Sequence, residues 1–325
     1  MDSPRKFLND LNALVNSPLR GESSKKFQDI CEAHDALSIQ QTGQPIQVTI
    51  PPYEGKNGNV LGLVSALQKE QGISSVILQG SLASEEEIPY SDFDSLVIIE
   101  NAVFGNPKVL MALVVRLQLL SRYMYRHDPL QHHGWFVTTE KLLNHHLDDF
   151  FPAVIFDHSR MLYPAKASEL KLNLVKDPSA FLYHLNTTVA GIEREITSGQ
   201  YLKNMYELKS TLSKFMLLPA LYMQVRKGEG VYKKYSFELA KVDFTAEEWN
   251  IMDEISTIRE DWNQNMAGWR KWMITTHPSW SRKMAKRVAP KVAADLQASV
   301  KDKSTKMLTF ARLMLERAKA TNGQN

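Results

Sequence analysis

Hydrophobic and polar residues follow two different rhythms along this chain, and the change of rhythm divides it. Residues 1–45 are polar with helical spacing, and from about residue 177 the apolar positions again recur every three or four residues. Between these parts, short apolar runs rich in β-branched residues predict strands at 46–53, 74–81, 92–100 and 133–139. We therefore predict an α+β fold with a helical segment (1–45), a small mixed-sheet α/β domain (46–170) and a helical bundle domain (171–325).

Two helices are predicted within the α/β part. Apolar residues at Val60, Leu63, Val64 and Leu67 keep the spacing of one helix face, with Asn59 expected as the N-cap and Gly72 as the end. A second apolar helix is predicted over 107–126.

Two further segments carry clear local signals. The run 152–163 is expected to form two short strands around a turn. Thr245 and Glu248 form a capping-box pattern, and Phe244 and Trp249 are placed for a hydrophobic staple. The helix that begins there is expected to bury a stripe at helical spacing, namely Ile251, Ile255, Ile258, Trp262, Met266 and Trp269.

Composition narrows the class of protein. The chain has 325 residues, of which 43% are hydrophobic and 23% charged, as in an ordinary globular protein. It lacks an apolar run of about 18 residues and an apolar N-terminal stretch, so neither a membrane span nor a signal peptide is expected, and a cytoplasmic location is predicted. Cys31 is the only cysteine, which excludes an intrachain disulfide and a two-cysteine zinc site.

Charge is distributed unevenly. The net charge is +3, but residues 281–325 contain eleven Lys or Arg and three Asp or Glu, so this tail carries +8 and the remainder −5. Such asymmetry is typical of a protein with an anionic partner, nucleic acid included. A solvated basic helix face is the other interpretation.

The chemistry is concentrated in one segment, Gly80-Ser81 followed after ten residues by Asp92-Phe93-Asp94. Residues i and i+2 of a strand point to the same face, so Asp92 and Asp94 can place two carboxylates on one hard cation such as Mg²⁺. Phe93 then points into the core. Gly80 permits a close approach of the backbone to a ligand, and Ser81 offers an N–H and a hydroxyl to a phosphate oxygen.

The run GSLASEEEIPYSDFDSLVII resembles the signature of the DNA-polymerase-β-type nucleotidyltransferase superfamily, in which a strand, Gly-Ser, a loop and Asp-x-Asp follow one another. The resemblance covers about residues 59–140. It implies that Gly80 and Ser81 grip the triphosphate of a nucleoside triphosphate, and that Asp92 and Asp94 hold Mg²⁺ or Mn²⁺. A helical C-terminal domain also suits this superfamily, which often uses one for the acceptor substrate.

The sequence departs from the superfamily at the third carboxylate, which usually comes from the next strand. Alignment of HHGWFVTTEKL with that strand puts His133 at this position. A histidine can act as a general base near neutral pH but is a poor Mg²⁺ ligand. Asp128 is the alternative if the strand begins earlier, and without either residue the site binds nucleotide with little turnover.

A glycine-containing basic loop at 227–236 offers further groups for a triphosphate. Lys233 or Lys234 could reach the phosphates, and the alternative is an ordinary interhelical connection.

The leading hypothesis is a metal-dependent nucleotidyltransferase that moves a nucleoside monophosphate from a nucleoside triphosphate to an acceptor hydroxyl or phosphate. The acidic run 85–87 on the site loop favours a small cationic acceptor over a polyanion. The alternatives are a regulatory or toxin–antitoxin-like nucleotide-binding module with little catalysis, and an RNA-modifying enzyme that docks through 281–325.

Overall fold

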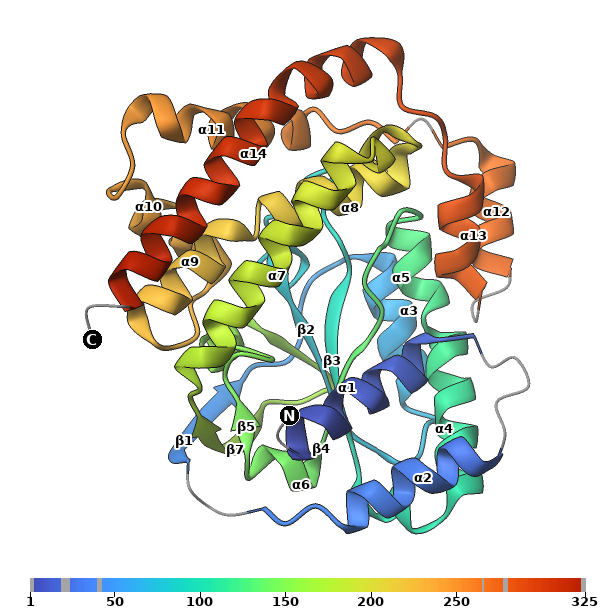
Figure 1. Ribbon diagram of the computed structural model, residues 1–325. Coiled ribbons are helices and arrows are strands. Elements are labelled where there is room, and N and C mark those ends of the chain that lie inside the picture. Colours follow the sequence, from blue (N-terminus) through green and yellow to red (C-terminus); the bar gives the residue numbers. More distant parts are fainter. Residues whose placement is uncertain (1–2, 19–23, 40–42, 265, 277–279, 323–325) are drawn as a thin grey trace.

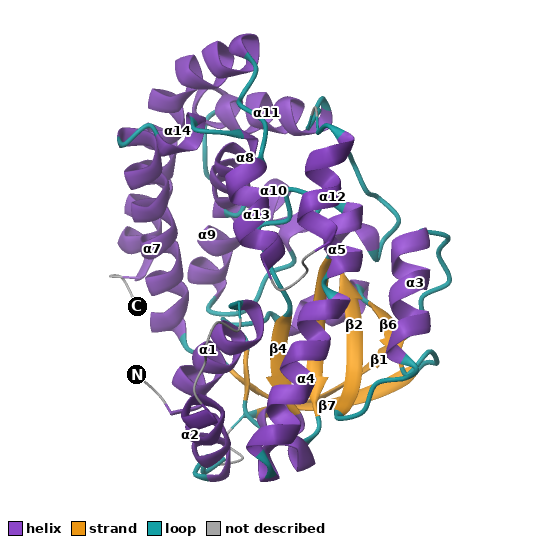
Figure 2. Ribbon diagram, turned by 90° about the vertical axis from the view of Figure 1, so that its right-hand side faces the viewer, coloured by secondary structure: helices purple, strands orange, loops and turns teal. Residues whose placement is uncertain are grey.

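The predicted α+β fold is confirmed by a computed structural model, which describes residues 3–18, 24–39, 43–264, 266–276 and 280–322. The strands and the helices of the first half form the lower part of the molecule, and the helices of the second half cover it from above (Figures 1 and 2). We describe the two parts in turn, because the candidate site lies where they meet.

The first part is built on two small sheets. The larger sheet has the strand order β4-β3-β2-β6, in which β3 pairs antiparallel with β2 and parallel with β4. Its strands are β2 (Ile73–Gln79), β3 (Asp94–Ile99), β4 (Phe136–Thr139) and β6 (Arg160–Tyr163). The smaller sheet, in the order β1-β7-β5, consists of β1 (Gln44–Ile50), β7 (Ser168–Val175) and β5 (His146–Leu147).

Helices of the first part pack on the larger sheet and on one another. Helix α1 contacts β4 and α4, and α3 contacts β6 and α5. They are α1 (Ser3–Asn16), α2 (Ser24–Asp35), α3 (Gly58–Leu67), α4 (Pro107–Leu120), α5 (Arg122–His127) and α6 (Glu140–Leu143). Val60, Leu63 and Leu67 are buried on α3, as the spacing predicts.

The second part is helical, and its core reaches into the first. Tyr90, Tyr125 and Leu130 belong to the same hydrophobic cluster as the interior of the helical part. The helices are α7 (Pro178–Thr197), α8 (Met205–Phe215), α9 (Leu218–Lys227), α10 (Lys233–Lys241), α11 (Ala246–Glu260), α12 (Gly268–Thr276), α13 (Ser281–Val288) and α14 (Ala294–Asn322). Within the described residues, no helix combines the length and apolar character needed to cross a membrane.

Helix boundaries differ from the prediction at three places. Asn57, not Asn59, caps α3, because its side chain accepts hydrogen bonds from the N–H groups of the next turn. The helix ends at Leu67, and Gly72 instead leads into β2 with a φ of +81°. The helix predicted over 107–126 is broken at Ser121, whose hydroxyl donates to the carbonyl of Gln118 at 2.7 Å.

Two strand predictions are also corrected. Residues 153–158 form a 3₁₀ helix rather than a strand, because Pro152 starts a tight turn in which its carbonyl accepts from Ile155 N–H at 3.0 Å. Strand β7 was not expected, although the alternation of Leu170, Leu172 and Leu174 with polar residues is a strand signal.

The capping box at Thr245 and Glu248 is confirmed, and the Phe244 and Trp249 rings lie 5.9 Å apart. The prediction that this helix continues beyond Ile258 and buries the rest of the stripe is wrong in part. Helix α11 ends at Glu260, so Trp262 is buried from a loop, whereas Trp269 lies in α12 and is 56% exposed.

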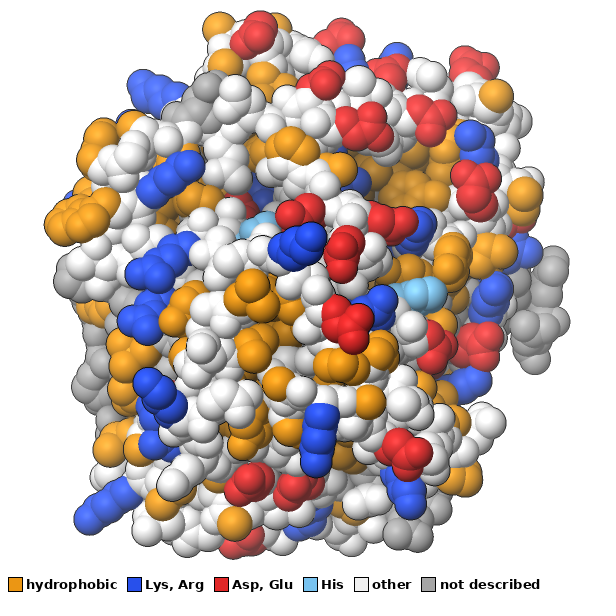
Figure 3. Space-filling model, turned by 180° about the vertical axis from the view of Figure 1, so that it is seen from behind, with side chains coloured by type: hydrophobic (Ala, Val, Ile, Leu, Met, Phe, Trp, Pro, Cys, Tyr) orange, Lys and Arg blue, Asp and Glu red, His pale blue; other side chains and the backbone are white. Residues whose placement is uncertain are grey.

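The basic tail is helical and is partly neutralised within the chain. Its cations pair with acids on α7, α8 and α11, as in the pairs Lys286–Glu207, Arg312–Glu193 and Arg317–Glu248. On the face seen from behind, basic side chains lie mainly along the left edge, and acidic side chains lie mainly in the centre and on the right (Figure 3).

Candidate active site at the junction of the two parts

Gly80 forms a turn at the end of β2, beside the first residue of β3. Its φ of +71° lies in the left-handed region, and a 3₁₀ turn over Gly80–Leu82 follows it. Gln79 pairs with Asp94 across the sheet, and a Cβ on Gly80 would lie 3.5 Å from Asp94 Oδ2. The glycine turn and one of the two aspartates are therefore direct neighbours.

The loop between the turn and the aspartates is closed by serine hydroxyls. Ser81 Oγ donates to Ser91 Oγ at 2.8 Å, and Ile88 N–H donates to Ser91 Oγ at 2.9 Å. The Ser81 hydroxyl, which was predicted to face a phosphate, thus forms a hydrogen bond within the loop instead.

Tyr90 anchors this loop in the helical part. Its ring packs edge-on against Trp262 with the ring centroids 4.9 Å apart, and its hydroxyl donates to the carbonyl of Lys209 at 2.5 Å. The loop that leads to Asp92 is therefore positioned by α8 and by the segment after α11.

Two histidines face Asp92 from the segment just before β4. Asp92, His132 and His133 bring one ligand atom each within 4.8 Å of the others. His132 is buried, and neither of its ring nitrogens has a hydrogen-bond partner among the described residues. Burial and the adjacent His133 lower the pKa of His132 to about 4, so His132 is neutral at pH 7 with a free ring nitrogen.

Gln131 holds this segment beside the aspartates. Its side chain is fully buried, and its amide group forms two hydrogen bonds with the backbone of Phe93. Phe93 N–H donates to Gln131 Oε1 at 2.9 Å, and Gln131 Nε2 donates to the Phe93 carbonyl at 3.0 Å. Phe93 itself points into the core, as predicted. A single amide side chain thus fixes where the two histidines lie relative to Asp92 and Asp94.

Lys209 brings a positive charge from α8 to the opposite side of Asp92. Its side chain is completely buried, with Nζ at 2.9 Å from Asp92 Oδ1 and 2.6 Å from Asp128 Oδ2. Asp128 also accepts from Leu130 N–H and from Gln264 Nε2. Asp128, the alternative third carboxylate, is thereby engaged by Lys209 and by neutral donors.

The two aspartates of the Asp-x-Asp pair have opposite electrostatic environments. Burial alone would raise the pKa of Asp92, but Lys209 and His132 outweigh it and hold that pKa well below its usual range. Burial and the charge of Asp92 raise the pKa of Asp94 to about 7. Near pH 7, Asp92 is therefore ionised and Asp94 is partly protonated. A bound cation would favour ionisation of both carboxylates.

The two predicted lysines lie in different places. Lys233 faces the aspartates, whose charges oppose the lowering of its pKa; burial and Arg259 still bring that pKa to about 8. Lys234 is exposed and pairs with Glu86 of the site loop at 2.5 Å. Only Lys233 is therefore positioned toward the site.

The residues present fit a divalent cation. Asp94 Oδ1 and the ring nitrogens of His132 are buried without a hydrogen bond among the described residues, whereas Asp92 Oδ1 lies 2.9 Å from Lys209 Nζ. A cation bound here would give a partner to the Asp94 oxygen and to one nitrogen of His132. An imidazole ligand beside carboxylates favours Mn²⁺ or Zn²⁺ over Mg²⁺, which prefers oxygen ligands.

The structure brings Gly80, Asp92, Asp94, His133 and Lys233 together at one place. Sequence reasoning missed Gln131 and Lys209, and it considered His132 as a transition-metal ligand without assigning it to the site. The adjacent His132-His133 pair was a visible signal, whereas nothing local marks Lys209, an isolated lysine on a helix remote in the chain.

Comparison with known proteins adds no relative: no family model, no curated protein and no solved structure matches this chain. The geometry described above is therefore the basis for a functional assignment.

Proposed function

We propose that this protein is a metal-dependent nucleotidyltransferase, which moves a nucleoside monophosphate from a nucleoside triphosphate to an acceptor hydroxyl or phosphate. The observation that carries the proposal is the placement of Asp94 Oδ2 against the left-handed Gly80 turn, together with the ligand atoms of Asp92, His132 and His133, which lie within 4.8 Å of one another. A turn of backbone N–H groups beside paired carboxylates is suited to a triphosphate with its cation.

Each group has a role in this scheme. Asp92, Asp94 and His132 would hold the cation, which neutralises phosphate charge and polarises the reacting phosphoryl group. Lys233, at the start of α10, would add a positive charge to the site. Part of the His133 side chain is exposed to solvent. Desolvation by the protein atoms around the ring lowers the pKa of His133, so its neutral ring can accept a proton from the attacking group.

The transfer needs only two reactants, the nucleoside triphosphate and the acceptor. The acceptor oxygen bonds to the α-phosphorus, the bond from that phosphorus to the bridging oxygen breaks, and pyrophosphate leaves. The proton of an attacking hydroxyl passes to His133 and then to solvent.

The proposal is tested by incubation of the protein with α-labelled nucleoside triphosphates, MnCl₂ or MgCl₂ and a small-molecule cell extract. We expect pyrophosphate release and a labelled product that are stronger with Mn²⁺. Asp94→Asn should reduce both at least a hundredfold, because it removes a charged ligand, whereas Asp10→Asn on the exposed face of α1 should leave them unchanged. Equal turnover in Asp94→Asn would contradict the proposal.

A second candidate function is nucleotide binding without efficient transfer. Two observations favour it: Asp128, the alternative third carboxylate, is paired with Lys209, and the same lysine already neutralises Asp92. Calorimetry that detects nucleotide binding while no pyrophosphate forms with any acceptor pool would select this candidate over the first.

The RNA-modifying alternative receives less support. Several cations of α13 and α14 are paired with acids of the same chain, so fewer are available to neutralise phosphates than the sequence count indicates.

A further inference from the structure

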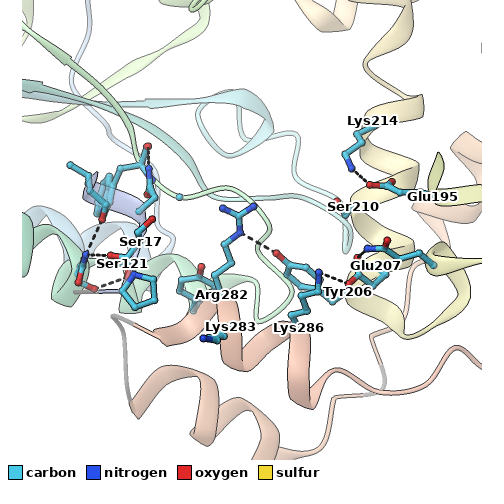
Figure 4. Close-up of a pocket in the computed structure, with 18 residues that line it drawn as sticks. Ser17, Ser121, Glu195, Tyr206, Glu207, Ser210, Lys214, Arg282, Lys283 and Lys286 are labelled. Carbon is cyan, nitrogen blue, oxygen red and sulfur yellow. Dashed lines mark hydrogen bonds and ion pairs between the residues drawn. The ribbon is translucent and has the colours of Figure 1, made fainter. Parts of the chain in front are cut away.

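A cavity lies beside the segment that precedes β4 and carries His133. It has a volume of about 490 Å³ and lies between the end of α1, the α4–α5 junction, α8 and α13 (Figure 4). Gly134 and Trp135, which directly follow His133, form part of its wall. This volume is in the range of pockets that hold a small organic molecule.

One wall of the cavity is rigid. Asn16 at the end of α1 bonds Trp135 at both ends, accepting from its N–H at 2.8 Å and donating to its carbonyl at 2.9 Å. A Cβ on Gly134 would lie 1.8 Å from Asn16 Oδ1, so only glycine fits there. The end of α1 therefore fixes the position of Gly134 and Trp135 in this wall.

Charges around the cavity do not balance. Four cations and two carboxylates line it, and each carboxylate already has a lysine, in the pairs Glu195–Lys214 and Glu207–Lys286. Arg282 and Lys283 have no carboxylate partner among the described residues. The polar contact of Arg282 is a long 3.4 Å hydrogen bond to the Tyr206 hydroxyl, and Lys283 lies over the Trp280 ring.

Figure 4 places Arg282 between two polar walls, one with Ser17 and Ser121 and the other with Tyr206 and Glu207. A guanidinium in such a position can bind a phosphate or carboxylate through two parallel hydrogen bonds. The hydroxyls and paired charges around it offer both donors and acceptors to the rest of a ligand.

We infer that this cavity binds a small phosphorylated molecule, with its phosphate on Arg282 and Lys283. Where the proposed function holds, the position of the cavity next to His133 makes this molecule the acceptor. This reverses the expectation of a cationic acceptor, which rested on the acidic run 85–87; Glu86 of that run is paired with Lys234.

Binding is tested by calorimetry on the full chain without nucleotide or metal, using inorganic phosphate and glucose 6-phosphate as anionic probes. Glucose and spermidine serve as the neutral and cationic comparisons. We expect at least one anionic probe to bind and neither comparison compound to do so. Arg282→Gln should weaken binding about tenfold or more, and Arg282→Lys should weaken it less.

Lys301→Gln, which removes one exposed charge on α14, is the matched control and should bind as the native chain does. Thermal unfolding of each variant verifies that the fold is intact. Absence of binding by both phosphates, equal binding in Arg282→Gln, or binding of spermidine would overturn the inference. Because the assay needs neither nucleotide nor metal, each of these results would leave the labelling test of the proposed function standing.

Discussion

At the scale of single residues, Gly80 has a backbone conformation that favours glycine. Its φ of +71° is costly for any residue with a Cβ, although the space beside it would admit one, since the nearest atom is Asp94 Oδ2 at 3.5 Å. Strain and space can therefore be separated by experiment.

We predict that Gly80→Ala lowers the free energy of unfolding by about 1–2 kcal/mol, the cost of a left-handed conformation with a Cβ. Urea denaturation measures this change. Gly58→Ala, at a position with open space on the first turn of α3 and an ordinary φ, should not destabilise the protein. Equal losses in both variants would contradict the assignment of strain to Gly80.

Lys233 gives the site a pH dependence of definite sign. Burial beside Arg259 lowers its pKa to about 8, so its charge is present at pH 7 and is lost as the pH rises through 8. We predict that the affinity for ATP and GTP, measured by calorimetry without added metal, falls about tenfold between pH 7 and pH 9.

The variants of these two lysines separate this effect from other alkaline titrations. Lys233→Arg remains charged over this range, so its affinity should stay nearly constant. Lys234→Met, at the exposed neighbour that pairs with Glu86, should keep the fall seen in the native chain. A fall of equal size in Lys233→Arg would assign the titration to another group.

At the scale of elements, the segment that precedes β4 places His132 and His133 beside Asp92. Strand pairing between β3 and β4 begins at Leu96 and Phe136, so the residues before it are not held by a ladder. In place of ladder hydrogen bonds, the Gln131 side chain forms two hydrogen bonds with the backbone of Phe93. It acts as a positioning residue, because it contacts the backbone between the two aspartates and not the cation itself.

We predict that Gln131→Ala lowers the free energy of unfolding by about 2 kcal/mol, since it leaves two buried backbone groups of Phe93 unpaired. It should also weaken Mn²⁺ binding by about 10- to 100-fold, as is typical of a change behind a metal ligand. Calorimetry with MnCl₂ measures this second effect, which a purely structural role would not produce in the folded protein. Gln28→Ala on the exposed face of α2 should change neither quantity.

Local signals predicted much of this fold and some of the site. Gly80 and Asp94 could be predicted because a strand, a glycine turn and a second strand are neighbours in the chain. The break at Ser121 and the 3₁₀ turn after Pro152 could not, because each depends on a hydrogen bond that competes with a continuous apolar pattern. Lys209 could not be predicted because only the packing of α8 against the Tyr90 loop brings it to Asp92.

At the scale of the whole molecule, Lys209 joins the two parts electrostatically. Asp92 and Asp128 belong to the first part, and Lys209 comes from a buried position on α8. Removal of one partner of such a buried cluster leaves uncompensated charge in a poorly solvated place.

We predict that Lys209→Met lowers the free energy of unfolding by about 3–5 kcal/mol, measured by urea denaturation. The double variant Lys209→Met with Asp128→Asn should recover part of this loss, because it removes one of the two unpaired carboxylates. Lys241→Met, an exposed position on α10, is the matched control and should have little effect. A small loss in Lys209→Met would show that the cluster is well solvated.

The origin of Lys209 has a consequence for any opening motion. The ammonium group that neutralises Asp92 belongs to the opposite half of the protein, so hinging the halves apart would withdraw it and leave neighbouring carboxylates to repel each other. Separation along this seam would therefore alter the ionisation of Asp92. A divalent ion bound at Asp92 in place of the ammonium group would offset that repulsion.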